Sequence, residues 1–311
     1  MSREWLSRLS HVGMVILLLV VLSIISPAFL SVQNLINVVR QASLLFILAS
    51  GLTIVVLTAG IDLSIGAVLA VSACVGANYI VQGSVWLGSL VGLAVGAACG
   101  LLNGLMVAVI GLPPFIATYG MLWVAEGTAQ GFMKGEITAE FPASFRFLGA
   151  GRILGIPVPI LLMVATLAAC SVALRRTNFG RYVYAMGANR EAARLSGIHI
   201  RRNLLLVYSA SGLLSAFAGL VYISRINGVE STIGEPLLLP ALAAVCIGGT
   251  SLFGGEGGIE GTLTGALIMT LVTNGMNLLN VSPYWQSFVM GTIVVMAVAI
   301  DQLGAEKVGR S

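Results

Sequence analysis

The sequence predicts an all-α fold, a polytopic membrane bundle of about ten transmembrane helices, and three observations support it. Hydrophobic residues make up 58% of the 311 residues, and the mean hydropathy is +1.00. Charged residues make up only 9%, whereas about a quarter of a soluble domain is charged. Apolar runs near the ~20 residues that cross ~30 Å of hydrocarbon recur along the chain. We therefore interpret residues 1–311 as a single transmembrane domain.

The apolar runs define the expected helices in chain order. No small-x-small cleavage site follows the first run, so we expect a retained helix rather than a signal peptide. Pro113 and Pro114 introduce the fifth run, which suits a helix start because the first amide hydrogens of a helix have no partner within it. A mixed, glycine-bearing loop follows over 134–157, and glycines break the short eighth run at 248 and 249. The ten runs cover residues 12–25, 44–59, 65–81, 86–110, 114–133, 158–174, 204–224, 237–247, 259–279 and 284–300.

Basic residues predict the orientation, because cytoplasmic segments carry an excess of lysine and arginine. With both termini inside, the inner segments hold eleven basic residues and the outer segments hold four. We therefore expect the N- and C-termini to face the cytoplasm. The inner set is Arg3, Arg8, the seven arginines between 175 and 202, Lys307 and Arg310, and the outer set is Lys134, Arg146, Arg152 and Arg225.

The segment 175–203 stands out because it holds seven arginines and a single acid, Glu191. Asn189 can cap a short helix over 190–196, and Gly197 suits its end. Within that helix, Ala192, Ala193 and Leu195 form a lightly apolar patch edged by charged residues, Arg190 and Arg194 among them. Two interpretations stay open: the segment docks into a cleft on a soluble partner, or it is a plain basic anchor.

Polar residues inside the runs are the candidates for a transport pathway or gate, because ionisable groups at membrane depth are expensive and usually functional. Asp62 with Ser64 precedes the third run, where an acid could cap a helix start or serve as a gate. Glu126 lies inside the fifth run and must face protein or water. Asn274 and Asn277, with Asn280, share one helix face and could bond between helices or line a polar cavity.

Glycines carry two further predictions. Gly92, Gly96, Gly100 and Gly104 recur at four-residue spacing, which suits close helix packing, with a pore-lining role as the alternative. The glycine-rich stretch 248–258 lacks the GxxxxGK[ST] pattern of a phosphate loop, so we interpret it as a tight re-entrant turn.

Other functions find little support. The four cysteines fall inside apolar runs without a CxxC pair, and the two histidines lie far apart, so no metal site or disulfide is expected. The formal net charge is +4, and the basic residues that produce it flank the apolar runs, where membrane orientation accounts for them. We therefore expect no nucleic-acid partner.

Several stretches, in order and at normal spacing over roughly residues 30–300, resemble the permease subunits of ribose-type (monosaccharide) ABC importers, in the branched-chain amino acid/ribose permease superfamily. The matching stretches are AGIDLSIG (59–66), GLPPFIAT (111–118), TNFGRYVYAMG (177–187), EAARLSGI (191–198), SRIN (224–227), IGGTSLFGG (247–255), GTL (261–263) and NGMNLL (274–279).

The resemblance implies a permease in the bacterial inner membrane, with no catalysis and no cofactor in this chain. ATP and Mg²⁺ would bind to separate ABC ATPase subunits, a periplasmic sugar-binding protein would deliver the substrate, and a second permease copy or a similar permease would complete a dimer in the lipid membrane. It also implies that residues 189–198 are the segment that couples to the ATPase, which assigns this role to Asn189, Arg190, Glu191, Ala192, Ala193, Arg194, Leu195, Ser196 and Gly197.

Two departures from the family pattern keep the substrate open. Leu238, Leu239 and Pro240 replace a frequent acidic Glu-Leu-Asp, and Glu126 replaces a frequent arginine. The expected substrate is therefore a monosaccharide or a related polyol, without a choice among them. The alternatives are a non-sugar solute such as a branched-chain amino acid or nucleoside, an ion-coupled secondary transporter that needs no partner, and a membrane scaffold without transport.

Overall fold

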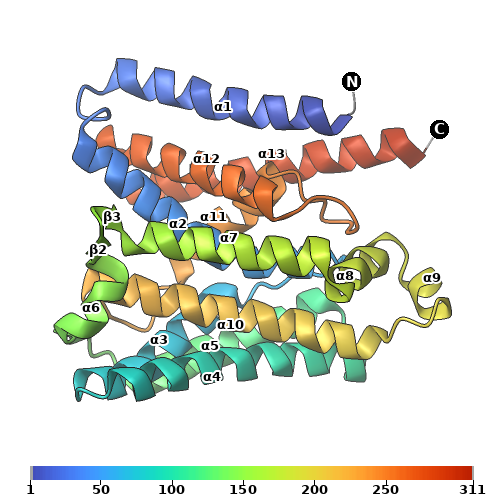
Figure 1. Ribbon diagram of the computed structural model, residues 1–311, viewed down its shortest axis with the longest axis horizontal. Helices are drawn as coiled ribbons and strands as arrows, with labels where there is room; N and C mark the ends of the chain where they lie inside the picture. The colour runs from blue at the N-terminus through green and yellow to red at the C-terminus, as the bar shows by residue number, and fades with distance from the viewer. Residues whose placement is uncertain (1–2, 310–311) are drawn as a thin grey trace.

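The computed structural model describes residues 3–309 and forms an all-α bundle in which the long helices lie roughly parallel or antiparallel (Figure 1). The first half of the chain forms α1 (Arg3–Ile25), α2 (Val32–Val56), α3 (Ile65–Val81), α4 (Val85–Leu105), the π-helix η1 (Met106–Ile110), α5 (Pro114–Met133) and α6 (Ala143–Ala150). The second half forms α7 (Val158–Arg176), α8 (Asn178–Ala188), α9 (Arg190–Leu195), α10 (Ile200–Ile226), the 3₁₀ helix η2 (Glu235–Leu237), α11 (Leu238–Ile247), α12 (Ile259–Leu278) and α13 (Pro283–Gly309).

The structure has two short β-ladders, and the one formed by β2 and β3 lies at the end of the bundle that is opposite to α9 (Figure 1). Strand β1 (Thr138–Ala139) pairs with β4 (Gly228–Val229), and β2 (Arg152–Ile153) pairs with β3 (Ile156–Pro157), both antiparallel. The expected loop over 134–157 therefore contains a helix and three strands, which corrects the sequence interpretation. Helix α6 was missed because its eight residues are too short for an apolar run.

The expected and observed helix bounds agree where an apolar run extends over the whole helix, and they differ where polar residues interrupt a run. Helices α3 and α5 have the expected ends. Helix α2 begins at Val32 rather than at residue 44, because Gln33, Asn34 and Arg40 lower the hydropathy of its first turns. The Ser31 hydroxyl starts this helix by accepting a hydrogen bond of 3.3 Å from the Asn34 amide.

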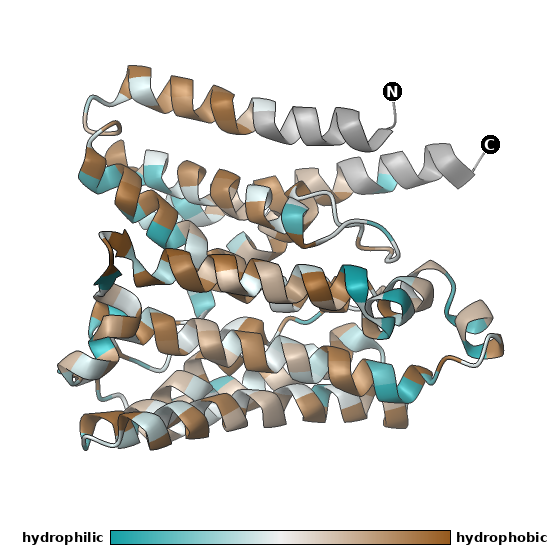
Figure 2. Cartoon of the chain, in the orientation of Figure 1, coloured by the Kyte–Doolittle hydropathy of each residue, from teal (hydrophilic) through white to brown (hydrophobic). Residues whose placement is uncertain are grey.

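Within the described part of the chain, four helices are long and apolar enough to cross a membrane: Val32–Val56, Val85–Ile110, Val158–Arg176 and Ile200–Ile226. Helices α5 and α12 have 20 residues each but are not among these four. The structure thus agrees with a membrane bundle, while the number of about ten spans stays a prediction. Hydrophobic residues dominate the visible faces of the long helices (Figure 2), as expected for a surface that contacts lipid.

Both ends of the described chain lie at one end of the bundle. Helix α1 begins and α13 ends on the side where α8 and α9 project (Figure 1). This arrangement fits termini on the same side of a membrane, and which side faces the cytoplasm stays a prediction. The side chains of Arg3, Arg8, Lys307 and Arg310, used in the orientation count, lie outside the described residues.

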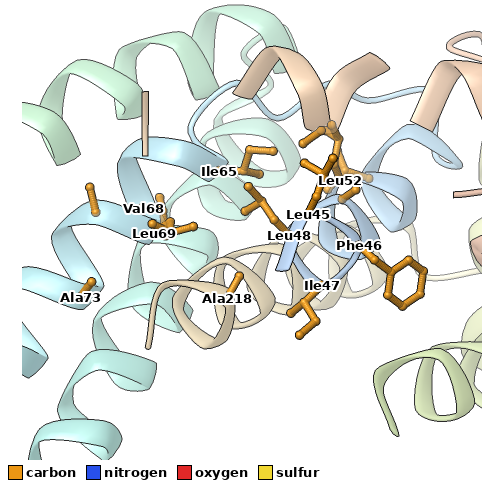
Figure 3. Close-up of a cluster of buried hydrophobic side chains, with 14 of the residues drawn as sticks. Leu45, Phe46, Ile47, Leu48, Leu52, Ile65, Val68, Leu69, Ala73 and Ala218 are labelled. Atoms are coloured by element: carbon orange, nitrogen blue, oxygen red, sulfur yellow. The ribbon is translucent and has the colours of Figure 1, made fainter. Parts of the chain in front are cut away.

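Helix α2 forms the centre of the core. Every residue of α2 from Ser43 to Val56 is buried, so neighbouring helices surround this half on all sides. Its side chains pack against Ile65, Val68 and Leu69 of α3 and Ala218 of α10 (Figure 3). This half of α2, buried on all sides, is therefore the scaffold on which the connection to α3, residues 57–64, rests.

Glycines let α4 approach α3 and α10 closely, which agrees with the packing interpretation. A Cβ atom at Gly92 would lie 3.0 Å from the Ser72 carbonyl oxygen of α3. A Cβ at Gly100 would collide with the Tyr208 carbonyl of α10. Backbone-to-backbone contact of this kind is typical of small residues between membrane helices.

Candidate functional site

Helix α9 and its flanking residues project beyond the ends of α7 and α10 (Figure 1). The Asn189 side-chain oxygen accepts a hydrogen bond of 2.9 Å from the Ala192 amide, as the sequence predicted for a helix cap. Gly197 follows with φ of +84°, a left-handed value that suits glycine. The helix spans Arg190–Leu195, so Ser196 caps its end rather than belonging to it.

The exposed surface of α9 differs from the predicted patch in one residue. Leu195 is 76% exposed and Ala192 is exposed, whereas Ala193 is only 4% exposed. Residues three apart share a helix face, so Ala192 and Leu195 point outward together while Ala193 turns toward the protein. Ala193 therefore anchors α9, and its inclusion in the outward patch was wrong.

Glu191 and Arg194 form an ion pair within α9, with 2.6 Å between Arg194 Nη2 and Glu191 Oε1. The Arg194 Nε also donates to Glu191 Oε2 over 3.0 Å. These hydrogen bonds and the guanidinium charge hold the pKa of the Glu191 carboxyl below its ordinary value. The acid is therefore ionised at neutral pH, and its fork-like pairing favours the helical form of this short segment.

The segment that carries α9 is fastened to the start of α12 and to the glycine-rich turn. Arg175, at the end of α7, pairs with Glu260 of α12 over 2.9 Å. The Ser171 hydroxyl donates to the other oxygen of Glu260, also over 2.9 Å. On α8, the Tyr184 hydroxyl donates to the Gly257 carbonyl over 3.0 Å. A displacement of α8 would therefore also displace the turn formed by residues 248–258.

The glycine-rich turn reaches in turn to the end of α2. The Gly255 amide donates to the Leu57 carbonyl over 3.0 Å, and a Cβ at Gly187 of α8 would collide with that same carbonyl. Gly254, Gly255 and Gly257 all have positive φ, as expected for a turn that needs glycine. Contacts thus run from α8 to the break between α2 and α3.

A buried polar network lies just beyond that break. Asp62 is 1% exposed and accepts hydrogen bonds from the Ser64 amide (3.0 Å), the Ser64 hydroxyl (2.6 Å) and the Ser211 hydroxyl (2.8 Å). Asn103 of α4 donates to the Ser64 hydroxyl over 2.8 Å. Asp62 thus accepts one amide hydrogen at the start of α3, and its other donors are hydroxyls. Within the described residues, Asn103 Oδ1 and the Tyr208 hydroxyl are buried without a hydrogen-bond partner.

A cavity of about 240 Å³ lies between α3, α5 and the segment 231–238. Its polar wall includes Glu126, which accepts a hydrogen bond of 3.1 Å from Gln130, and Glu235 at the start of η2. Its aromatic wall consists of Tyr119 and Trp123, whose rings meet edge to face. Carboxylates accept hydrogen bonds from hydroxyl groups and aromatic rings cover apolar faces, so the lining suits a small polar solute with hydroxyls.

The structure separates the predicted pathway residues into two groups. Glu126 lines the cavity, whereas Asp62 and Ser64 lie buried in the network behind its wall. Glu235 was not predicted, although it is an acid in the polar stretch that precedes the short α11. Glu235 and Glu126 line the same cavity, although Glu126 lies more than 100 residues earlier in the chain.

The two asparagines of α12 bond between elements rather than line this cavity. Asn274 exchanges hydrogen bonds of 3.1 and 2.9 Å with Asn34 of α2. Asn277 accepts a hydrogen bond of 2.9 Å from Gln286 of α13. The structure therefore favours the first of the two predicted roles, hydrogen bonding between helices.

The described part of the chain offers no cluster of three or more histidine, cysteine or acidic residues suited to a metal ion. No disulfide involves the described cysteines Cys74, Cys99, Cys170 and Cys246.

Comparison with known proteins places these features in context. Residues 34–298 match the family described as "Branched-chain amino acid transport system / permease component". The chain is 38% identical to the ribose import permease protein RbsC of Escherichia coli (strain K12), over 96% of this chain and 95% of the relative. It is 41% identical to ribose import permease protein RbsC of Bacillus subtilis (strain 168), over 92% and 90%. It is 36% identical to the fructose import permease protein FrcC of Rhizobium meliloti, over 90% and 80%. No solved structure matches the chain.

Proposed function

The chain belongs to the family of branched-chain amino acid transport system permease components, and from that premise we propose that it is the permease subunit of an ABC importer for a monosaccharide or related polyol. The near full-length similarity to ribose and fructose import permeases supports this substrate class. The protein is a multi-pass component of the bacterial inner membrane, and residues 1–311 act as one transmembrane permease domain of about ten spans with both termini in the cytoplasm.

The chain transports and does not catalyse. ATP and Mg²⁺ bind to separate ABC ATPase subunits, and a periplasmic sugar-binding protein delivers the solute. A second permease, identical or similar, lies beside this one so that the two together enclose the translocation path. These partners follow from the family and are part of the proposal.

One observation carries the coupling role: α9 is a short, capped helix that presents Leu195, 76% exposed, at the end of the bundle. An exposed leucine on a rigid, projecting helix suits insertion into a cleft of a soluble partner, as in other helix-in-groove contacts. The ion pair between Glu191 and Arg194 favours the helical form of α9, so a push on it moves a folded unit. Through α8 and the turn at 248–258, such a push reaches Leu57 at the end of α2.

The cavity beside α5 is this chain's half of the translocation path, and the second permease contributes the other half. Glu126 and Glu235 accept hydrogen bonds from sugar hydroxyls, and Trp123 covers an apolar sugar face. The exposed side chains of Tyr119 and Trp123 (46% and 58%) leave one side of the cavity uncovered, where a second permease would pack. Asp62 holds the start of α3 in place behind this wall and does not contact the solute.

Reconstitution tests the proposal. The chain, its ATPase and its binding protein are placed in proteoliposomes, and uptake of labelled ribose, fructose, galactose, leucine and a nucleoside is measured. We expect ATP-dependent uptake of a sugar that requires all three proteins. Uptake of leucine or the nucleoside instead of a sugar would replace the substrate class. Uptake by the chain alone, driven by an ion gradient, would replace the ABC mechanism.

A further inference from the structure

A second cavity, of about 290 Å³, lies at the end of the bundle that carries α9. Helix α8 forms one wall with Phe179 and Tyr182, and the first turns of α10 form the other. The lining contributed by α10 and the residues before it is Gly197, Ile198, His199, Arg202, Asn203 and Leu206. This cavity shares no residue with the one beside α5.

The polar rim of this cavity is cationic or neutral and lacks acids. Arg202 and His199 line it, and neither side chain has a hydrogen-bond or ion-pair partner among the described residues. Two acids near α8 and α9 are already engaged: Glu191 pairs with Arg194, and Glu260 pairs with Arg175. A third, Glu256 of the turn 248–258, does not line the cavity. An arginine with free donors beside a cavity favours an anion, and phosphate matches its planar donor set.

Apart from Asn203 and the Tyr182 hydroxyl, the remaining lining is apolar, and an apolar surface continues along α10 toward the middle of the bundle. Leu206 is 48% exposed, and Leu213, two helical turns further on, is 43% exposed on the same side of the helix. Figure 2 shows the same change along α10, with hydrophilic residues at the end near α8 and α9 and hydrophobic residues beyond them. The cavity therefore lies where a charged loop meets a helix surface that can contact acyl chains.

These observations identify the occupant by its chemistry. A phosphate diester with attached acyl chains would satisfy the cationic rim and the exposed leucines together, whereas free phosphate would use only the rim. The cavity lies at the lower limit of ligand pockets, which hold about 300–1,000 Å³, so it has room for a headgroup while the chains lie outside along α10. Basic pockets between membrane helices bind anionic lipid headgroups in this way.

We propose that the cavity between α8 and the start of α10 binds the phosphodiester headgroup of an anionic phospholipid, with Arg202 and His199 as its ligands. The acyl chains lie against Leu206 and Leu213. Because Gly197 and Ile198 lead directly from α9 into the cavity wall, the bound lipid braces the base of the coupling helix.

Native mass spectrometry of the purified chain tests this site. Phosphatidylglycerol is titrated against phosphatidylcholine, and the affinity of the most tightly bound lipid is measured for the parent, Arg202→Gln and Arg202→Lys. Arg201→Gln is the matched control, because Arg201 is the exposed neighbour with the same charge and does not line the cavity. We expect Arg202→Gln to weaken phosphatidylglycerol binding about fivefold, with a further loss on adding His199→Gln. Arg202→Lys should retain part of the affinity, because it keeps the charge but loses the planar donor set, and Arg201→Gln should change it less than about twofold.

Four results would overturn the proposal. Equal losses for Arg201→Gln and Arg202→Gln would mean diffuse surface attraction, and equal binding of the two lipids would mean that charge is not recognised. Displacement of the lipid by millimolar inorganic phosphate would identify a free-phosphate site. Loss of ATPase binding by Arg202→Gln with unchanged lipid binding would identify a partner surface. Thermal melts in detergent verify that every variant is folded.

Discussion

The Ser211 hydroxyl of α10 donates a hydrogen bond of 2.8 Å to the carboxylate of Asp62, which lies 149 residues earlier in the chain. The same carboxylate accepts two hydrogen bonds from Ser64, and Asn103 of α4 donates to that serine. One acid thus joins the connection between α2 and α3 to two neighbouring helices. An acid that satisfies three buried donors stabilises the fold, and this role requires no contact with a transported solute.

Asp62→Leu should destabilise the protein strongly, because each buried donor left without an acceptor costs about 1–3 kcal/mol. Asp62→Asn should cost less, since its amide oxygen still accepts from Ser64 while the Ser211 hydroxyl can rotate to accept from the amide. Recovery of the monodisperse size-exclusion peak after heating measures both. If the leucine variant were as stable as the parent, the network would not hold this part of the fold.

Gly100→Ala should lower the stability, although alanine is favoured over glycine in an isolated helix by about 1 kcal/mol. The new methyl group would collide with the Tyr208 carbonyl and force α4 away from α10. Gly120→Ala on α5 is the matched control, because nothing lies within 4 Å of its Cβ position. The same thermal assay should therefore give opposite signs for the two variants. Equal effects would mean that the close approach of α4 and α10 does not matter.

Leu195→Asp should abolish ATP-dependent uptake and leave the fold intact, because the side chain is 76% exposed and surface substitutions usually change stability by less than about 0.5 kcal/mol. The charge would oppose insertion into an apolar cleft on the ATPase. Glu191→Lys should act in the same direction, since it also removes the ion pair with Arg194. Uptake and co-purification of the ATPase measure the effect.

The control for this surface is Leu154→Asp in the turn between β2 and β3. Leu154 is 97% exposed and lies at the opposite end of the bundle, so this variant introduces the same charge away from α9. We expect normal coupling to the ATPase. Wild-type uptake by both Leu195→Asp and Glu191→Lys would show that the ATPase docks elsewhere.

Local signals predicted a large part of this structure. The apolar runs predicted the bounds of α3 and α5, and Pro113 and Pro114 indicated where α5 starts. The Asn189 and Gly197 pair predicted the ends of α9, because these residues act on their own neighbours. The start of α2 was missed because hydropathy does not distinguish a polar helical turn from a loop. Ala193 was misplaced because the predicted patch did not take into account which way each side chain points.

Contacts between distant segments could not be predicted from periodicity. The sequence indicated that Glu126 faces protein or water, but not that Glu235 shares its cavity, since nothing local links α5 to η2. The same holds for Asp62, whose partner Ser211 is an ordinary serine in an apolar helix. Such pairings arise from how the helices pack. They assign Asp62 to the buried network and Glu126 to the cavity.

Glu126→Gln and Glu235→Gln should each raise the KM for transport about tenfold or more. We expect this because each carboxylate accepts a charged hydrogen bond from the solute, and such a bond is worth about 1.5–3 kcal/mol. Both residues line the cavity beside Trp123, whereas Glu136, just past the end of α5, is exposed and does not. Glu136→Gln is therefore the control, and uptake against concentration in proteoliposomes measures all three. Co-purification of the ATPase should be unchanged, because the cavity lies away from α9. A rise in KM for Glu126→Gln alone would restrict the path to α5, and unchanged kinetics for both would place the path outside this cavity.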